Sequence, residues 1–285
     1  MLKRTGLIAI LLLCSGLQNI CADDWPQWMG ALMNGVWNEP NTIDSFPESG
    51  PDVLWRAPIG AGYTGPSVVG DHLYVMDRTS DEGIGKDVEN DIRKRGEIPG
   101  GERIVCMNTE TGEIIWQHSY DCPYKIAYPT GPRCTPTVDG EYVYTLGAMG
   151  NLKCLSTNDG TVKWEISLTD VYGTRPPPWG FSSHPIIDGS HVIVPVGGEG
   201  SAVVCFDKLT GEEIWKNLTS SDVAYAPLLI YEHDGERQLL MWHGDGVDSL
   251  NPLTGEHFWH HKFPEEKAQA AATSIVTPRI VGNQY

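Results

Sequence analysis

The segment Thr111-Gly112-Glu113-Ile114-Ile115-Trp116 introduces a motif, Gly-x-x-x-Trp after a turn residue, that occurs four times. The other copies are DGTVKW at 159–164, TGEEIW at 210–215 and TGEHFW at 254–259. Ten residues before each Trp there is a small residue, which is Cys106, Cys154, Cys205 or Ser249. A unit that recurs every ~40–50 residues is typical of propellers and solenoids.

A second signature precedes each Gly-x-x-x-Trp motif. Pro66-Ser67-Val68-Val69-Gly70 has copies that begin at Pro136, Pro185 and Pro278, and Pro227 opens a variant with a longer turn. Short apolar stretches lie between the two signatures, and Asp-Gly and Thr-Gly pairs separate them. Such pairs between alternating segments are typical of hairpin turns. Each unit is therefore interpreted as four antiparallel strands: a Pro-strand, an aromatic strand, a small-residue strand and a Trp-strand.

Four-stranded units of this period predict an all-β fold, a β-propeller of four-stranded antiparallel blades. The blades are expected at residues 60–116, 130–164, 181–215 and 224–259, and a fifth is expected to begin near Thr273. A stacked β-sandwich is the alternative, but it does not explain why Trp and Gly recur in the same register. A single sheet cannot bury both faces, so the seams between blades are expected to be filled by four indoles: Trp116, Trp164, Trp215 and Trp259.

The ends of the repeat region suggest a larger ring. Val53-Leu54-Trp55-Arg56 resembles a lone Trp-strand, which in closed propellers usually completes the last blade beside the C-terminal strands. We therefore expect residues 53–285 to be a C-terminally incomplete part of a seven- or eight-bladed propeller. A ring completed in an unusual way is the alternative.

The N-terminus predicts export. Lys3 and Arg4 precede an apolar run from Leu7 to Leu13, which is far shorter than the ~20 residues of a membrane span. We expect residues 1–22 to be a cleaved secretory signal peptide, and a signal anchor is the alternative. Residues 23–52 are expected to form an extended segment, and the mature chain is expected to be periplasmic or extracellular with no transmembrane span.

Composition narrows the classes of partner. The chain of 285 residues contains 37 acidic and 20 basic residues, for a formal net charge of −17, which argues against a nucleic-acid or anionic-membrane surface. Its 10 Trp and 11 Tyr residues indicate a packed interior rather than disorder. The partner is therefore expected to be a protein or a small molecule.

Five cysteines remain after the predicted signal peptide, an odd number for an oxidising compartment. Cys106, Cys154 and Cys205 are explained as small buried residues in equivalent strands. Cys122 and Cys134 flank a loop rich in Pro and Tyr, where a disulfide between them is one option and two free thiols are the other.

These segments resemble the pyrroloquinoline-quinone-like (PQQ-like) repeat family over most of the chain from Asp23 to Tyr285. Secreted bacterial members of that family open with a Trp-Pro-Gln-aromatic segment, which Asp24-Trp25-Pro26-Gln27-Trp28 matches. Where such proteins continue with Arg-Gly-Pro-Asn, this chain has Met29-Gly30-Ala31-Leu32. The family includes quinoprotein dehydrogenases, outer-membrane-assembly lipoproteins and many non-catalytic members, so the resemblance indicates a fold more than an activity.

Three functions follow from the resemblance. A quinoprotein dehydrogenase would stack PQQ between a Trp and a vicinal Cys-Cys disulfide and would hold Ca²⁺ through oxygen ligands. No two cysteines of this chain are adjacent, and no Cys-x-x-Cys-His haem motif is present. No catalytic residue is therefore predicted, and an exported binding or scaffold module is preferred. An outer-membrane assembly factor remains the third option; it would need a lipidated Cys, and Leu13 before Cys14 and Ile20 before Cys21 suit that modification poorly.

Four residues are candidates for a ligand site at the mouth of the central channel. The Pro-strand is usually innermost, and Arg133, His184 and Tyr225 lie just before such strands, while Trp179 lies in the preceding loop. An Arg among aromatic residues suits a carboxylate or a sugar. The alternative for Arg133 is a structural bridge between blades.

A group of three histidines surrounds Trp259. Alternation along a strand places His257 and His261 on one face and His260 on the other. An exposed strand edge is the preferred interpretation, and no metal site is predicted there.

Overall fold

The computed structural model describes residues 23–39, 42–80, 96–220, 222–223, 225–233 and 235–264. These residues form four sheets, each with four strands in sequential order. The first two sheets comprise β1 (Ser67–Val69), β2 (His72–Arg78), β3 (Gly101–Asn108) and β4 (Ile114–Asp121), then β5 (Thr137–Asp139), β6 (Tyr142–Leu146), β7 (Asn151–Ser156) and β8 (Val162–Ser167). After the short helix α1 (Leu168–Tyr172) come β9 (Ile186–Asp188), β10 (His191–Pro195), β11 (Val203–Asp207) and β12 (Glu213–Asn217), then β13 (Leu229–His233), β14 (Glu236–His243), β15 (Gly246–Leu250) and β16 (His257–Lys262).

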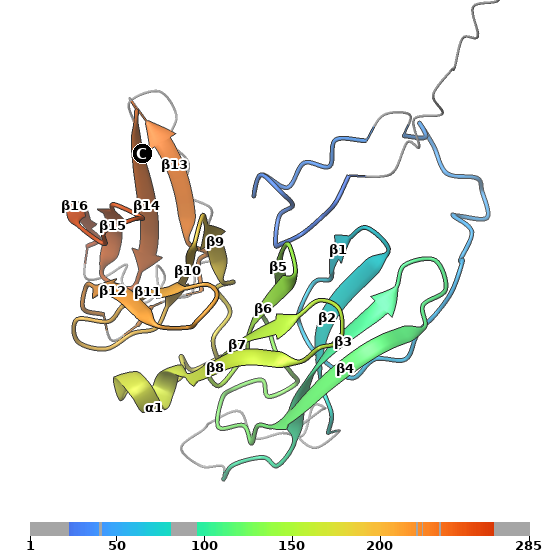
Figure 1. Cartoon of the computed structure of the whole chain (residues 1–285), viewed down its shortest axis with the longest axis horizontal. Coiled ribbons are helices and arrows are strands. Elements are labelled where there is room, and N and C mark those ends of the chain that lie inside the picture. Colours follow the sequence, from blue (N-terminus) through green and yellow to red (C-terminus); the bar gives the residue numbers. More distant parts are fainter. Residues whose placement is uncertain are drawn as a thin grey trace, which may run out of the picture.

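The four sheets follow one another around an arc (Figure 1). The first strand of each sheet (β1, β5, β9, β13) lies on the inner side of the arc, and the last (β4, β8, β12, β16) lies on the outer side. All strand pairs within the sheets are antiparallel. This confirms the predicted β-propeller architecture and the predicted order of strands in each blade.

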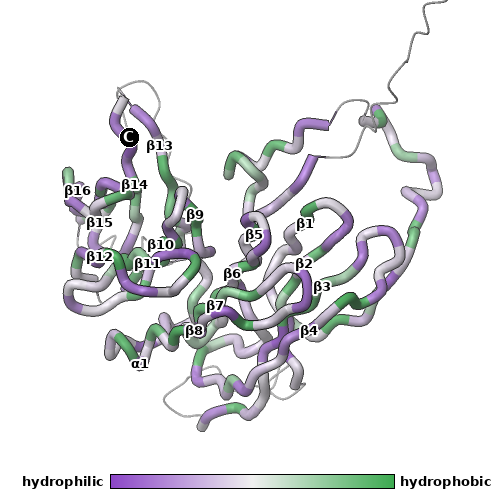
Figure 2. Tube along the Cα trace, viewed as in Figure 1, coloured by the Kyte–Doolittle hydropathy of each residue, from purple (hydrophilic) through white to green (hydrophobic). Residues whose placement is uncertain are grey.

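The Trp-strands extend beyond the predicted C-terminal ends of the blades, which coincide with the Trp residues. Strand β4 continues five residues past Trp116 to Asp121, and the equivalent strands also run beyond their Trp. Figure 2 shows hydrophobic and hydrophilic residues mixed within each sheet, and the outer strand β4 alternates between buried and exposed positions around Trp116. Such alternation is expected of a strand with one face on the core.

The small residue and the Trp of each repeat are direct cross-strand partners. Cys106 lies opposite Trp116, and the same register holds in the other three sheets, which pair Cys154 with Trp164, Cys205 with Trp215 and Ser249 with Trp259. A register shift follows the small residue in every sheet. The small residue leaves room on the face of the sheet that the indole occupies.

Three of the four seam indoles also pack on the glycine of the next repeat. Trp116 lies against Gly160, where a Cβ would come within 2.4 Å of Trp116 Cε3, and Trp116 Nε1 donates a hydrogen bond to the carbonyl of Thr157 (2.7 Å). Gly160 has φ +71°, a left-handed conformation that favours glycine. The same contact recurs between Trp164 and Gly211, between Trp215 and Gly255, and between Trp55 and Gly112.

Trp259, the fourth seam Trp, has a different hydrogen-bond partner within the described residues. Trp259 Nε1 donates to Gln238 Oε1 (3.1 Å) within its own sheet. The expected fifth blade near Thr273 and the Pro278 signature lie outside the described residues, as does the predicted signal peptide, residues 1–22.

Apolar side chains from facing sheets form the core between blades. The largest cluster joins Tyr144, Leu146 and Cys154 of the second sheet to residues of the third, among them Val192, Val194 and Phe206. Burial of such surface between sheets contributes ~25 cal/mol per Å². The hydrophobic core is therefore distributed over the seams, and each blade is stabilised by its neighbours.

The N-terminal segment covers the inner edges of the first two sheets. Trp25 and Val68 exchange backbone hydrogen bonds of 2.8 and 2.9 Å, and the Val138 N–H donates to the Pro26 carbonyl (2.8 Å). These bonds satisfy backbone groups of β1 and β5 that the blades themselves leave unpaired. They also place Trp28 beside the inner strands.

A buried ion pair stabilises the first sheet. The Asp77 side chain is fully buried and accepts hydrogen bonds from Arg103 Nη2 (2.6 Å), Arg103 Nε (3.0 Å) and the Gly60 N–H (2.5 Å). The Arg103 hydrogen bonds to Asp77 raise the pKa of the guanidinium despite its partial burial. The carboxylate is thus compensated by a charged partner and by a backbone donor.

The five cysteines of the described chain are buried free thiols. Cys122 Sγ lies 3.5 Å from Asn151 Oδ1, and Cys134 Sγ lies 3.5 Å from the Ser183 carbonyl. Of the two options for Cys122 and Cys134, the structure has the separate thiols. No helix within the described residues is long and apolar enough to cross a bilayer.

Candidate ligand-binding site

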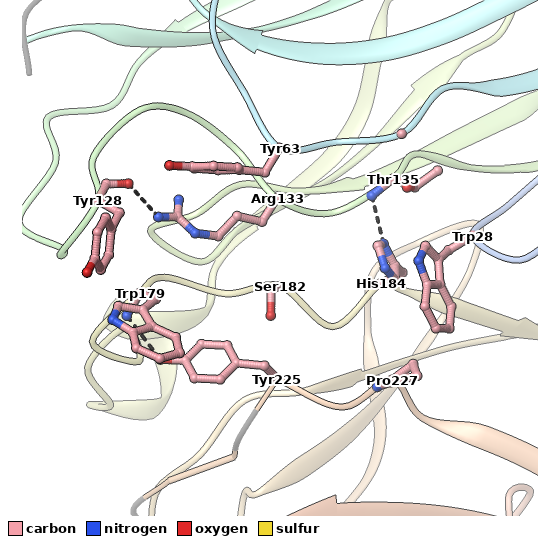
Figure 3. Close-up of a pocket in the computed structure, with 11 residues that line it drawn as sticks. Trp28, Tyr63, Tyr128, Arg133, Thr135, Trp179, Ser182, His184, Tyr225 and Pro227 are labelled. Atoms are coloured by element: carbon pink, nitrogen blue, oxygen red, sulfur yellow. Dashed lines mark hydrogen bonds between the residues drawn. The ribbon is translucent and has the colours of Figure 1, made fainter. Parts of the chain in front are cut away.

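A pocket of about 680 Å³ lies where the segments leading into the innermost strands meet (Figure 3). It is lined by Trp28, Tyr63, Gly65, Tyr128, Arg133, Thr135, Trp179, Ser182, His184, Tyr225 and Pro227. All four residues that the sequence nominated for the channel mouth are among them. They converge because the segments that lead into the innermost strands of successive blades face the same axis.

Trp179 and Tyr225 form an aromatic wall. Their rings are stacked with centroids 5.1 Å apart and an interplanar angle of 24°, and the Trp179 N–H donates to the Tyr225 hydroxyl (3.0 Å). Burial raises the pKa of Tyr225 to about 12, so its hydroxyl is neutral at ordinary pH. Tyr128 meets Trp179 edge-on with centroids 6.3 Å apart. Trp179 is 38% exposed and presents aromatic surface to a ligand.

Arg133 lies across the pocket from this wall (Figure 3). Its guanidinium donates to the carbonyls of Gly131 (2.5 Å), Tyr128 (2.7 Å) and Ala127 (3.2 Å), and lies 5.1 Å from the ring centroid of Tyr63. These bonds brace the loop that precedes Arg133, while the Tyr63 contact reaches the segment before β1. Burial lowers the pKa of Arg133.

The charge of Arg133 is not neutralised inside the pocket. No carboxylate is among the described residues that line it. Three of the five N–H donors of a guanidinium are used by carbonyls, which leaves donors for an anion. In a protein of net charge −17, this is a local positive site surrounded by aromatic surface.

His184 contributes a neutral polar edge. Its Nδ1 accepts a hydrogen bond from the Thr135 N–H (2.7 Å), and its ring stacks on Trp28 with centroids 5.0 Å apart. Burial lowers the pKa of His184 to about 3, so the imidazole is neutral at physiological pH. Because Nδ1 is the acceptor, the ring hydrogen resides on Nε2, which is a donor.

Ser182 adds an unsatisfied polar group. Its hydroxyl oxygen is buried and has no hydrogen-bond partner among the residues that the structure describes, and Figure 3 shows it directed into the pocket between Arg133 and Tyr225. A buried hydroxyl without a partner costs roughly 1–3 kcal/mol, which a ligand atom at this position would offset.

Several lining residues are not among the sequence-predicted candidates, although the repeats carry a signal for two of them. Tyr63, Arg133 and Ser182 all lie three residues before the Pro of their signature. Comparing this position across repeats would have found Tyr63 and Ser182. Trp28 carries no repeat signal, because it enters from the N-terminal segment.

The pocket does not fit a calcium-bound quinone. Ca²⁺ takes six to eight oxygen ligands, mainly from carboxylates and amides. The described lining offers neither Asp, Glu, Asn nor Gln. The aromatic wall and Arg133 suit a flat anionic ring, but the cation that accompanies PQQ in dehydrogenases would find no donor set here.

The histidines near Trp259 are arranged differently from the prediction. His257 and His260 both contact Asp248, at 2.7 and 3.0 Å, so the expectation that they lie on opposite faces is wrong. The register shift between Ser249 and Leu250 places an extra residue in β16, which returns His257 to the face of His260. Burial alone would raise the pKa of Asp248, but hydrogen bonds from the histidines outweigh it and lower the pKa.

Known proteins resemble this chain in sequence and in fold. An outer membrane protein assembly factor BamB from Burkholderia pseudomallei (strain K96243) is 27% identical over 238 residues, which cover 70% of this chain and 55% of the relative. A quinohemoprotein alcohol dehydrogenase from Comamonas testosteroni superposes with a TM-score of 0.55 at 15% identity, over 86% of this chain and 42% of that one. The chain thus spans about half the length of these proteins.

One family model matches most of the repeats. A family model described as outer membrane protein assembly factor BamB matches residues 100–284. That match includes three of the four described sheets and exceeds half of the chain. The chain therefore belongs to this family of PQQ-like repeat β-propellers.

Proposed function

We propose that this protein is an exported binding module whose central pocket holds a small anionic ligand with a flat ring or a sugar ring, without catalysing a reaction. The observation that carries the proposal is the stacked Trp179–Tyr225 wall facing Arg133, whose charge no lining carboxylate balances. Aromatic faces bind rings, and a guanidinium binds carboxylates.

The polar groups support the same ligand class. Within the described part of the chain Ser182 Oγ has no partner, and the neutral His184 keeps Nε2 as a donor, so both suit the hydroxyl or carbonyl oxygens of such a ligand. None of these groups forms the nucleophile–base pair that covalent catalysis needs. Binding is therefore the function that the arrangement supports best.

Titration of tryptophan fluorescence tests the proposal on the full chain. The probes are D-glucuronate and benzoate, each compared with its uncharged counterpart, D-glucose and benzyl alcohol. We expect saturable binding of a carboxylated probe that is at least about 10-fold tighter than binding of its uncharged counterpart, since a charged hydrogen bond contributes ~1.5–3 kcal/mol.

Variants locate the binding site. Trp179→Ala is expected to weaken binding by about 10-fold or more, whereas Trp37→Ala, which removes an exposed indole outside this pocket, leaves binding unchanged. Equal effects of the two variants, or no saturable binding of either carboxylated probe, contradict the proposal. Dye reduction after addition of PQQ and Ca²⁺ would instead establish the quinoprotein alternative.

A role in outer-membrane protein assembly is the second candidate. The observation that favours it is the match to the BamB family model. It requires export, for which we propose that residues 1–22 are a signal peptide, followed by an N-terminal segment at 23–52 and propeller repeats from 53 onward. Mass spectrometry of the mature N-terminus separates the candidates: cleavage before Asp23 supports the exported binding module, and a lipidated Cys21 supports the assembly factor.

A further inference from the structure

Asp248 in β15 is surrounded by three imidazoles. Its Oδ2 lies 2.6 Å from His243 Nε2 and 3.0 Å from His260 Nδ1, and its Oδ1 lies 2.7 Å from His257 Nε2. The side chains of Asp248 and His243 are 5% and 4% exposed, whereas those of His260 and His257 are 36% and 37% exposed. The cluster therefore has a buried half and a half that is open to solvent.

Three adjacent strands contribute residues to this cluster. His243 ends β14, Asp248 lies in the middle of β15, and His257 and His260 come from β16. Asp248 is the cross-strand partner of His260, and the register shift in β16 brings His257 to the same face. The donors are thus held by a hydrogen-bonded sheet rather than by loops, which favours a preorganised site.

We propose that His243, Asp248 and His260, with His257 as a fourth donor, bind a divalent transition-metal ion, with Zn²⁺ as the best match. Zn²⁺ takes four ligands from imidazole nitrogens at ~2.0–2.1 Å and carboxylate oxygens, and three His with one Asp provide that set. This site is separate from the aromatic pocket and does not depend on the proposed function.

The separations among three of the four proposed donors suit a tetrahedral ion. Ligand atoms of His243, Asp248 and His260 lie within 4.8 Å of one another. Ligands at the bond lengths of Zn²⁺ are ~3.4 Å apart in a tetrahedron. The contacts that His243 (2.6 Å) and His260 (3.0 Å) make with Asp248 each need to open by less than 1 Å, and rotation of the partly exposed His260 side chain opens the second.

A second carboxylate is placed to orient His243. Asp245 Oδ2 lies 3.7 Å from His243 Nδ1, and the Asp245 N–H donates a hydrogen bond to the same nitrogen (3.3 Å). Metal ligation through Nε2 puts the ring hydrogen on Nδ1, so the hydrogen bond from the Asp245 N–H is exchanged for one to the nearby Asp245 carboxylate. Metal-binding histidines usually have such a partner for their other nitrogen.

The test uses the full chain without a polyhistidine tag. Isothermal titration with ZnCl₂ is expected to give one site per chain. His260→Ala is expected to weaken that site by about 100-fold or more, because it removes a ligand on the exposed side. His261→Ala is the matched control, since His261 is the next residue in β16 and contacts Phe263.

Two further measurements distinguish a loss of zinc binding from a loss of folding. Circular dichroism confirms that both variants retain the β fold, and X-ray absorption of the zinc-loaded chain is expected to show four N/O ligands with imidazole scattering. The proposal is overturned if zinc binds no more tightly to the wild type than to His260→Ala, or if His261→Ala weakens binding equally. In those cases Asp248 is a hydrogen-bonding centre that joins the three strands.

Discussion

The packing between blades predicts that a side chain at Gly160 destabilises the fold. Its φ of +71° and the Trp116 ring leave no room for a side chain, because a Cβ would lie 2.4 Å from Trp116 Cε3. Gly140, in the β5–β6 turn of the same sheet, has a similar φ of +57° but no atom within 4 Å of its Cβ position. Alanine at the two sites therefore separates backbone strain from seam packing.

The two alanine substitutions are expected to lower the free energy of unfolding by different amounts. Gly140→Ala incurs only the cost of placing alanine in a left-handed backbone conformation, ~1–2 kcal/mol. Gly160→Ala incurs the same strain plus overpacking of ~1–3 kcal/mol, and it displaces the indole that donates to the Thr157 carbonyl, a bond that contributes ~0.5–1.5 kcal/mol. We expect Gly160→Ala to lower the free energy of unfolding by about 2 kcal/mol more than Gly140→Ala does.

Urea unfolding followed by circular dichroism and tryptophan fluorescence measures both values. Coincident transitions by the two probes establish that the free energies can be compared. In a Trp116→Leu background, the cost of Gly160→Ala should fall to that of Gly140→Ala, because the clashing ring has gone. Equal destabilisation by both alanines in the wild type would refute the assigned role of the Trp–Gly contact.

Two further predictions concern buried ionisable groups. Since the folded pKa of His184 is lowered to about 3, its contribution to stability is complete above pH 6.5 and decreases as the pH falls, by about 2 kcal/mol between pH 7 and 5. His184→Gln should lose less stability over this range in urea unfolding, and an unchanged pH dependence would contradict the burial of a neutral ring. Arg103→Met leaves the Asp77 carboxylate buried with the Gly60 N–H as its one remaining donor among the described residues, and should lower the free energy of unfolding by about 3–5 kcal/mol. Adding Asp77→Asn should restore part of that loss, and no recovery would show that Arg103 acts through packing alone.

Much of the architecture was predictable because its determinants are local. Turn pairs and alternating apolar residues specify each hairpin within ten or twenty residues of chain. The small residue ten positions before each Trp indicated a position that must leave room, and the register places it directly opposite that Trp. The recurrence of these signals in four units then indicated radial packing, since each sheet needs a neighbour for its second face.

The candidate pocket was predictable only in part. Arg133, His184 and Tyr225 were nominated because they precede innermost strands, and with Trp179 they line one cavity. The repeat pattern also indicates Tyr63 and Ser182, but it does not predict Trp28 or the groups that hold Arg133. Trp28 reaches the pocket by pairing of the N-terminal segment with inner strands, and the loop carbonyls that hold Arg133 depend on how residues 127–131 fold back.

The amino-acid order alone determined the strands, their succession in each blade, the Trp–Gly spacing and the acidic character of the chain, because these depend on neighbours along the chain and on composition. The tertiary structure decided which distant groups meet: the aromatic wall with Arg133, the separate thiols of Cys122 and Cys134, and the histidines gathered around Asp248. One extra residue in β16 moved His257 to the face of His260, since strand alternation has a period of two and a shift of one residue inverts it.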